Sequence, residues 1–404
     1  MPVSGILVKR LLKPCILFNP PSFTVEFNED LSAFHSPTLE SERAYSSSAI
    51  SYILSLYPPN TQIIVMGHSM GGVVATSLLP SPNISAIITM STPHTLPPAR
   101  FDSRIDKIYA RNYELLLSDT TPILSLCGGA TDMMIPSESC ILPEAPRKHS
   151  ELIYRRTVFT SALEGSWTGV GHREMVWCHQ VRWRVARAAI ELGGASSIFD
   201  QAAVFDRWLR DGNHLVVPVP PLDELSLSDP LAFETLPDGM DLVLRGPKGS
   251  RIYLLPVGSS SQFVLYLSQG SILSVSPQHS KSLRASVYLC HGKEGRHPSR
   301  SAGIGPTDMS CRTLPPSSLK LIPNPVPGKP FPLPEEGADE SEGVAVFEAN
   351  IVAPLEAWVA VQIEGGDGSG WIIGGLNAQP SSRLVINNGG TLGKFGGQCS
   401  CSIS

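Results

Sequence analysis

Short apolar runs alternate with amphipathic stretches along the first half of the chain, from about residue 14 to about residue 210. The clearest apolar runs cover residues 62–66, 84–90 and 122–127, and we expect each of them to form a strand. The segments between these runs carry the spacing of helices. Strands that alternate with helices predict an α/β fold, with a mostly parallel sheet flanked by helices.

The last helical pattern of this half runs from about residue 173 to residue 192. Its broad apolar face carries Val176, Val181, Val185, Ala189 and Ile190. Three arginines fall mostly elsewhere, and we expect them to form a solvated face: Arg182, Arg184 and Arg187.

The pattern changes at the proline-rich run 216–221, because proline can neither continue a helix nor sit inside a sheet. Beyond it the apolar period becomes two, in segments at 241–244, 251–255, 262–267, 286–289, 344–347 and 358–361. This alternation predicts a β-sandwich-like domain with an exposed proline-rich loop at 314–334. We therefore expect an α/β domain at 1–212, a linker at 213–239, a β-rich domain at 240–390 and a flexible tail at 391–404. The β-rich half carries no chemical constellation and is expected to be a structural or substrate-docking module.

The motif Gly67-His68-Ser69-Met70-Gly71, directly after the apolar run 62–66, predicts a nucleophile elbow. A sharp turn from strand to helix holds the serine where a base can take its proton, and glycine is needed at 67 and 71 because side chains there would collide. Gly72 lets the helix pack closely, and the N–H of Met70 is a candidate donor to the oxyanion of an acyl-transfer intermediate. The five-residue pattern also occurs by chance, so the strand and helix patterns around it carry the argument. Ser69 is the candidate nucleophile, and the fold is predicted to be of the α/β-hydrolase type.

In such folds the acid and then the base follow the nucleophile along the chain. Asp132 lies in the loop after the strand at 122–127, where a carboxylate can accept an imidazole N–H; the alternative role is that of a turn or cap aspartate. His172, in a glycine-rich loop that opens onto the helical pattern, is the candidate base. The other candidates combine less well with this order and loop position: His68, His94, His149 and His179. We expect His94, which follows the strand at 84–90, to have a structural role.

The charge and hydropathy of the 404 residues exclude some functions. A net charge of −5 with mixed signs argues against a nucleic-acid partner. No run of about 18 uncharged apolar residues is present, so no membrane span is predicted. Lys9, Arg10 and Lys13 interrupt the early apolar stretch that a signal peptide would need. On composition alone we expect a soluble protein.

The eight cysteines leave the redox compartment open. Cys127, Cys140, Cys178 and Cys290 lie in or beside apolar runs and are predicted to be small core residues. Cys399 and Cys401 lack the partner pair of a metal site, so neither a metal nor a cofactor is expected. Asn83-Ile84-Ser85 is a glycosylation sequon, which is usable only in the secretory pathway.

Together these segments resemble the GPI inositol-deacylase family. The similarity lies in residues 23–34, 49–54, 67–72, 91–94 and 128–136, and in His172 with residues 176–178. It is strong over about residues 20–190 and looser over the β-rich remainder. The resemblance places the family's triad on Ser69, Asp132 and His172.

The resemblance implies hydrolysis of the ester that links a fatty acyl chain to the inositol of GPI-anchored proteins. Ser69 would attack the ester carbonyl, His172 would take and return the proton, and water would release the fatty acid. The resemblance further implies membrane association, on the lumenal side of the endoplasmic reticulum membrane, in support of the export and quality control of GPI-anchored proteins.

Two departures from the family are visible. Residues 1–20 contain neither a membrane span nor the glycine-rich loop that should supply a second oxyanion donor, whose loss costs on the order of a hundredfold to a thousandfold in rate. The chain ends at Ser404 without the family's C-terminal membrane spans, so we expect an incomplete or alternatively spliced product. Two alternatives stay open: a generic soluble lipase or esterase with the same triad, and an inactive GPI-binding relative.

Overall fold

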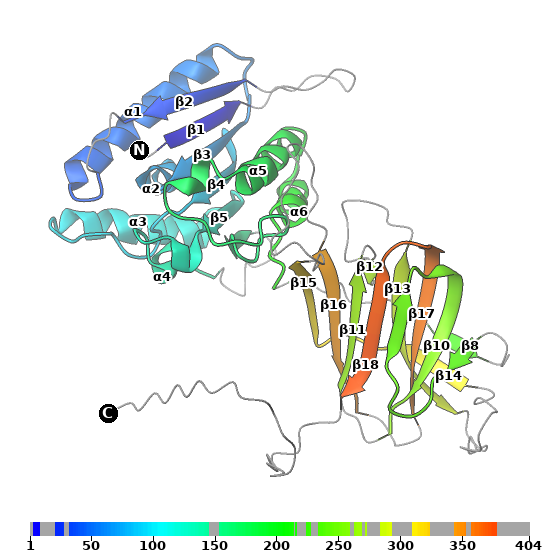
Figure 1. Ribbon diagram of the computed structural model, residues 1–404. Helices are drawn as coiled ribbons and strands as arrows, with labels where there is room; N and C mark the ends of the chain where they lie inside the picture. Colours follow the sequence, from blue (N-terminus) through cyan, green and yellow to red (C-terminus); the bar gives the residue numbers. More distant parts are fainter. Residues whose placement is uncertain are drawn as a thin grey trace, which may run out of the picture.

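The computed structural model describes the residues 3–8, 21–27, 32–144, 153–213, 215, 224–227, 233–258, 262–268, 271–272, 283–292, 309–323, 343–352 and 357–377. Within these ranges an α/β unit, up to residue 213, is followed by a β unit that begins at residue 224 (Figure 1). The predictions for His149, Cys399, Cys401 and the tail at 391–404 lie outside the described residues.

The described part of the α/β unit contains one six-stranded sheet in the order β2-β1-β3-β4-β5-β6. Its strands are β1 (Val3–Val8), β2 (Ser22–Glu26), β3 (Ile63–His68), β4 (Ile84–Met90), β5 (Ile123–Cys127) and β6 (Arg155–Phe159). Strands β3 to β6 pair in parallel, whereas β1 runs antiparallel to both of its neighbours. The predicted mostly parallel sheet is confirmed, and β2, β3, β4, β5 and β6 all end at the same edge.

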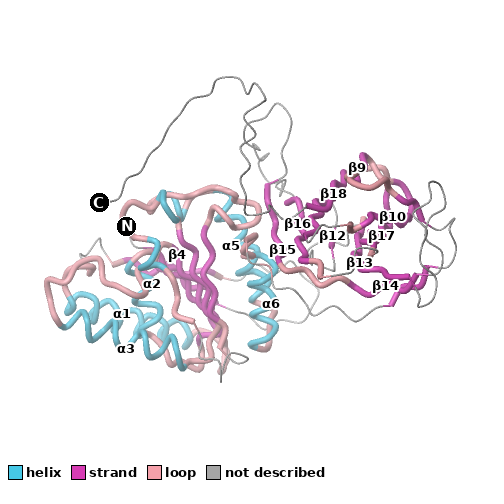
Figure 2. Tube along the Cα trace, turned by 90° about the horizontal axis from the view of Figure 1, so that it is seen from below, coloured by secondary structure: helices cyan, strands magenta, loops and turns pink. Residues whose placement is uncertain are grey.

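Helices cover both faces of this sheet (Figure 2). One face packs against α1 (Ser36–Ser55), α2 (Met70–Ser77) and α3 (Arg104–Ser118), and the other against α5 (His179–Leu192) and α6 (Ile198–Trp208). Side chains of β3 alternate between the faces, since Ile63 and Val65 join the first core and Ile64 joins the second. The central strands β3, β4 and β5 are mostly apolar and almost entirely buried because helices cover both of their faces. The loop after β5 holds a 3-10 turn, η1 (Gly129–Thr131), and the short helix α4 (Ser137–Cys140).

The helix predicted at 173–192 begins later than expected, because a 3-10 turn, η3 (Glu174–Val176), precedes α5. Three positions of the predicted apolar face of α5 are buried: Val181, Val185 and Ala189. Ile190, by contrast, is exposed. The expected solvated position is wrong for Arg184, which is only 2% exposed. Its guanidinium lies against Gly165 in the loop before α5, where a built Cβ would be 2.6 Å from Arg184 Nε.

The described residues of the β unit form two facing sheets, which confirms the predicted sandwich (Figure 1). The larger sheet contains β7 (Glu224–Leu227), β14 (Met309–Thr313), β13 (Arg284–Gly292), β17 (Trp358–Asp367), β10 (Lys248–Pro256) and β8 (Phe233–Thr235), with β12 (Ser271–Ile272) paired to β13. The smaller sheet contains β15 (Ser318–Pro323), β16 (Gly343–Asn350), β11 (Gln262–Ser268), β18 (Trp371–Asn377) and β9 (Leu242–Arg245). Alternate residues of both sheets, such as Phe263 and Val361, meet in one apolar core.

Two proline-rich segments contain strands that the sequence pattern does not indicate. β7 and β8 lie within 213–239, the range suggested as a linker, and both pair with strands of the larger sheet. The predicted exposed loop at 314–334 is wrong for residues 318–323, because they form β15, whose Leu319 and Leu321 are buried. β15 is an edge strand, and an edge strand tolerates nearby proline because one of its sides needs no ladder partner.

Three cysteines predicted to be isolated core residues are instead bonded in pairs. Cys127 is linked to Cys140 and Cys290 to Cys311, and all four side chains are buried. Cys178 is a free, partly buried thiol. Among the helices that the structure describes, none combines the length and the apolar character needed to cross a bilayer.

Candidate active site

Ser69 stands between the end of β3 and the first turn of α2. Its backbone has φ 54° and ψ −130°, a conformation that costs a non-glycine residue about 1–3 kcal/mol. The Ser69 N–H donates to the carbonyl of Met90 at 2.9 Å, and the Ser69 carbonyl accepts the N–H of Gly72 at 3.0 Å. The strand and the helix thus hold the serine in the strained turn that its motif predicts.

Glycines allow β3 and α2 to approach closely at this turn. A Cβ built on Gly67 would lie 2.5 Å from the Cα of Gly72 and 2.6 Å from the carbonyl oxygen of Gly71. A Cβ on Gly72 would lie 2.0 Å from Oγ1 of Thr92. A side chain at 67 would therefore push α2 away from β3, and one at 72 would push α2 away from the segment that follows β4.

The structure brings Ser69, His172 and Asp132 together from three different loops. His172 Nε2 lies 3.0 Å from Ser69 Oγ, and His172 Nδ1 lies 3.1 Å from Asp132 Oδ2. Because a carboxylate only accepts, Nδ1 carries the proton and Nε2 is left to accept the Ser69 hydroxyl. Both His172 and Asp132 are buried. This arrangement can raise the nucleophilicity of a serine and stabilise an imidazolium.

The loop after β5 holds the carboxylate of Asp132 in place. Its Oδ1 accepts the backbone N–H groups of Met134 at 3.0 Å and Ile135 at 2.9 Å. Burial by itself raises the pKa of Asp132, but the hydrogen bonds from His172 and from the Ile135 amide outweigh burial and lower the net pKa. Asp132 is therefore ionised at neutral pH and can hold His172 in the required tautomer.

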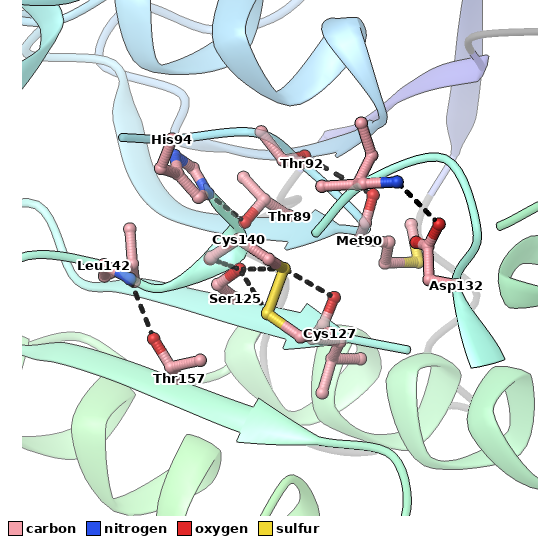
Figure 3. The surroundings of a disulfide bond; sticks show 12 residues. Thr89, Met90, Thr92, His94, Ser125, Cys127, Asp132, Cys140, Leu142 and Thr157 are labelled. Atoms are coloured by element: carbon pink, nitrogen blue, oxygen red, sulfur yellow. Dashed lines mark hydrogen bonds between the residues drawn. A yellow bond between two sulfur atoms is a disulfide. The ribbon is translucent and has the colours of Figure 1, made fainter. Parts of the chain in front are cut away.

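The Cys127–Cys140 disulfide closes this loop at its base (Figure 3). Asp132 lies inside the closed segment, whose two cysteines are 13 residues apart. The hydroxyl of Ser125 donates to the carbonyl of Cys140 at 3.1 Å, which binds the two ends of the loop a second time. In the sequence Cys127 and Cys140 lie on either side of Asp132, but the sequence alone does not show that they are bonded to each other.

The other histidines of the region have different surroundings. His68 is buried and donates from Nε2 to the backbone carbonyl of His172 at 2.8 Å, with the two rings 4.8 Å apart. It therefore supports the candidate base, a role that sequence reasoning misses. His94 is buried, and its Nε2 lies 2.8 Å from the hydroxyl of Thr89. His179 begins α5 and stacks on a tryptophan.

Met70 begins α2 and is buried. Its N–H, at the helix terminus next to Ser69, stays the predicted oxyanion donor. β3 lies between β4, which is parallel to it, and β1. β1 runs antiparallel to β3, so the first residues of β1 and not its last lie next to Gly67.

Comparison with known proteins relates the α/β unit to a described family. Residues 16–192 match the family described as PGAP1-like alpha/beta domain. This range agrees with the span of about 20–190 over which the sequence resembles GPI inositol-deacylases.

Curated relatives extend the similarity into the β unit. The GPI inositol-deacylase of Cryptococcus neoformans var. neoformans serotype D (strain B-3501A) is 31% identical over 341 residues, which cover 81% of this chain and 37% of that protein. The GPI inositol-deacylase of Neurospora crassa is 36% identical over 282 residues, covering 59% of this chain and 22% of that protein. GPI inositol-deacylase A of Yarrowia lipolytica is 37% identical over 193 residues, covering 43% and 18%. The chain thus spans well under half the length of these relatives.

The buried His94 predicts a pH-dependent stability. Burial, together with the charge of Arg155, lowers the pKa of His94 from 6.5 to about 3. Between these two values the unfolded chain binds a proton that the folded chain does not, so stability falls as the pH falls, by up to about 1.4 kcal/mol per pH unit. We expect His94→Gln, which can keep the hydrogen bond to Thr89, to flatten this dependence between about pH 6.5 and pH 3. Chemical denaturation at a series of pH values measures it, and parallel curves for variant and wild type would contradict it.

The disulfide around Asp132 predicts a loss that is specific to the site. Cys140→Ser opens the loop and should cost about 3 kcal/mol of stability, and it should also slow labelling of Ser69 by a fluorophosphonate because Asp132 is held less firmly. Cys311→Ser opens the other disulfide, in the β unit, and is the matched control. We expect it to lower stability and leave the labelling rate near that of wild type. Equal labelling rates for the two variants would contradict this role of the Asp132 loop.

Proposed function

We propose, from the match of residues 16–192 to the PGAP1-like alpha/beta domain family, that the chain is a serine ester hydrolase. Its proposed substrate is the fatty acyl ester on the inositol of GPI-anchored proteins. The observation that carries the proposal is the pair of hydrogen bonds that joins Asp132 to His172 and His172 to Ser69 Oγ.

The reaction follows from these contacts. His172 Nε2 takes the proton of Ser69 as Oγ attacks the ester carbonyl, and Asp132 stabilises the imidazolium that forms. The backbone N–H of Met70 donates to the oxyanion. The inositol oxygen leaves with the proton returned by His172. Water, deprotonated by the same imidazole, then releases the fatty acid from the acyl-enzyme.

Two observations favour the acyl-inositol substrate over simple esters. The relatives named GPI inositol-deacylase match this chain beyond the α/β unit, over 81% of its length in the Cryptococcus protein. The triad also lies in a chain whose sandwich domain accompanies the hydrolase unit, an arrangement that a small soluble esterase does not need.

The disulfides support a place in the secretory pathway. Cys127–Cys140 and Cys290–Cys311 are buried bonds in two different units. Disulfides form and persist in oxidising compartments such as the lumen of the endoplasmic reticulum and are rare in the cytosol. We infer that the chain folds and acts in that lumen, where GPI-anchored proteins begin their export.

Large apolar side chains are exposed at the edge of the sheet that holds Ser69. The loops that follow β2, β4, β5 and β6 at this edge carry Phe34, Phe101, Met133, Met134 and Trp177, all exposed. Met133, next to Asp132, is 89% exposed. Exposed apolar side chains gathered around one site are typical of a surface that meets lipid. We infer that this edge faces the membrane in which the acylated lipid is anchored.

Replacement of the nucleophile or the base tests the proposed activity. Ser69→Ala and His172→Ala should lose fluorophosphonate labelling and lower the release of fatty acid from an acyl-inositol GPI by a thousandfold or more, on the order seen when triads are dismantled. Mass spectrometry of the released fatty acid measures the second effect. Ser69→Gly is a folding control, since it removes the hydroxyl together with the backbone strain and should raise the unfolding temperature.

The outcomes separate the alternatives. A wild type that is labelled and cleaves simple esters, but not acyl-inositol, would be a generic esterase. A folded wild type that is not labelled at Ser69 would be an inactive relative.

Replacement of the exposed apolar side chains in the loops at this edge of the sheet tests whether the edge faces lipid. Phe101→Ser, Met133→Ser and Trp177→Ser combined should weaken co-sedimentation with phosphatidylcholine vesicles by at least about tenfold, because each side chain removes apolar area from the contact. Tyr45→Ser, Tyr52→Ser and Leu56→Ser combined change three exposed apolar side chains on α1 and directly after it, and serve as the control. Equal losses of co-sedimentation in both variants would argue against a lipid-facing surface at this edge.

A further inference from the structure

Trp167 lies five residues before His172, in the loop that leads from β6 to the candidate base. Its backbone has φ 51°, in the left-handed region that bulky side chains avoid. A bulky residue keeps such a conformation only where its surroundings hold it there. The contacts of the indole ring provide that hold.

The indole of Trp167 packs against the β unit. A Cβ built on Gly343, at the start of β16, would lie 3.3 Å from Cζ2 of Trp167. A Cβ on Gly212, in the segment that leaves the α/β unit, would lie 2.9 Å from Cζ3. The same two glycines adjoin Leu321 of β15, and Trp167 packs against the apolar core of the sandwich. The ring therefore sits at the junction of the two units, on glycines that leave room for it.

Backbone hydrogen bonds tie the same loop to the sandwich. The N–H of Gly212 donates to the carbonyl of Ala162 at the start of the loop, at 2.7 Å. The carbonyl of Gly212 in turn accepts the N–H of Leu321 in β15, also at 2.7 Å. A partly buried ion pair between Arg210 and Glu164 binds the loop to this segment again. Residues 210–212 thus hold the beginning of the His172 loop, and the hydrogen bond from Leu321 joins these residues to the sandwich.

The end of the loop rests on the segment that carries Asp132. A Cβ on Gly128 would lie 2.1 Å from the carbonyl oxygen of Val170, and a Cβ on Gly169 would lie 2.6 Å from Oγ1 of Thr131. Residues 169–171 are therefore held between Trp167 and the acid loop. A shift of Trp167 would be passed to His172 over this short, crowded stretch.

From these contacts we propose that Trp167 is a positioning residue, through which the β sandwich holds His172 in line with Ser69 and Asp132. This rests on the proposed function, because it concerns the base of the same triad. It gives the β unit a part in the reaction beyond structure or substrate docking.

Trp167 positions the His172 loop by packing and not by a hydrogen bond. The indole N–H of Trp167 is buried and has no acceptor among the residues that the structure describes. Phenylalanine keeps an aromatic ring at the junction and lacks this N–H. Trp167→Phe should therefore retain the positioning, and Trp167→Ala should lose it.

The test uses the full chain with two readouts. In Trp167→Ala, amide hydrogen exchange in the peptides that span 166–172 should quicken, and kcat for a small water-soluble ester should fall about ten- to a hundredfold, the range expected for an ångström-scale misplacement. KM for that ester should stay unchanged, because Trp167 is proposed to act on the position of His172 and not on the substrate. Trp167→Phe should resemble wild type in both readouts.

Variants of β15 approach the same contact from the other side. Leu321→Ala should lower kcat in the same direction, and Leu321→Ala combined with Trp167→Ala should fall no further than Trp167→Ala alone, since both remove one contact. Leu319→Ala is the control, because Leu319 is buried on the same strand without adjoining the two glycines under the indole. It should lower stability and leave exchange at 166–172 and kcat unchanged.

Unchanged exchange and kcat in folded Trp167→Ala would overturn the proposal. Losses of equal size in Leu319→Ala would also overturn it, since general loosening of the sandwich would then be the cause. A wild type that is not labelled at Ser69 would refute the proposed function instead, and the exchange readout would still decide whether Trp167 positions the loop.

Discussion

The close approach of β3 and α2 around Ser69 is the constraint on which the rest of the site depends. A serine with φ 54° is held against its own backbone preference, and only packing on every side can hold it. Gly67 and Gly72 permit the contact, and the cores on the two faces of the sheet enforce it. Asp132 and His172 then have to reach a serine whose position the sheet has already fixed.

The three side chains of the proposed triad are supported in different ways. Ser69 depends on local glycines, and Asp132 depends on amides of its own loop and on a nearby disulfide. His172 has the least local support, because its loop leans on His68, on the acid loop and on the second unit. The base is thus the triad member whose position depends most on residues distant in the sequence.

The parts of the fold that the sequence predicts are those with local causes. The elbow is visible because glycine spacing and flanking patterns are local, and the order of Asp132 and His172 follows from the fold type. The burial of Arg184 and the bond between Cys127 and Cys140 are not visible, since each depends on a partner chosen by tertiary packing. β15 is likewise not visible in the sequence. The prolines around it predict a loop, but an edge strand tolerates proline.

The junction at Trp167 also orders events during synthesis. All three triad residues have been added once the ribosome passes residue 172, but Leu321 and Gly343 follow about 150 and 170 residues later. At about 5–20 residues per second this interval is on the order of ten to thirty seconds. During this interval the nascent α/β unit contains Ser69 but lacks the residues of the sandwich against which Trp167 packs. On the proposed role of Trp167, His172 therefore becomes aligned with Ser69 only after residues 321–343 have been added, and not when the α/β unit is complete.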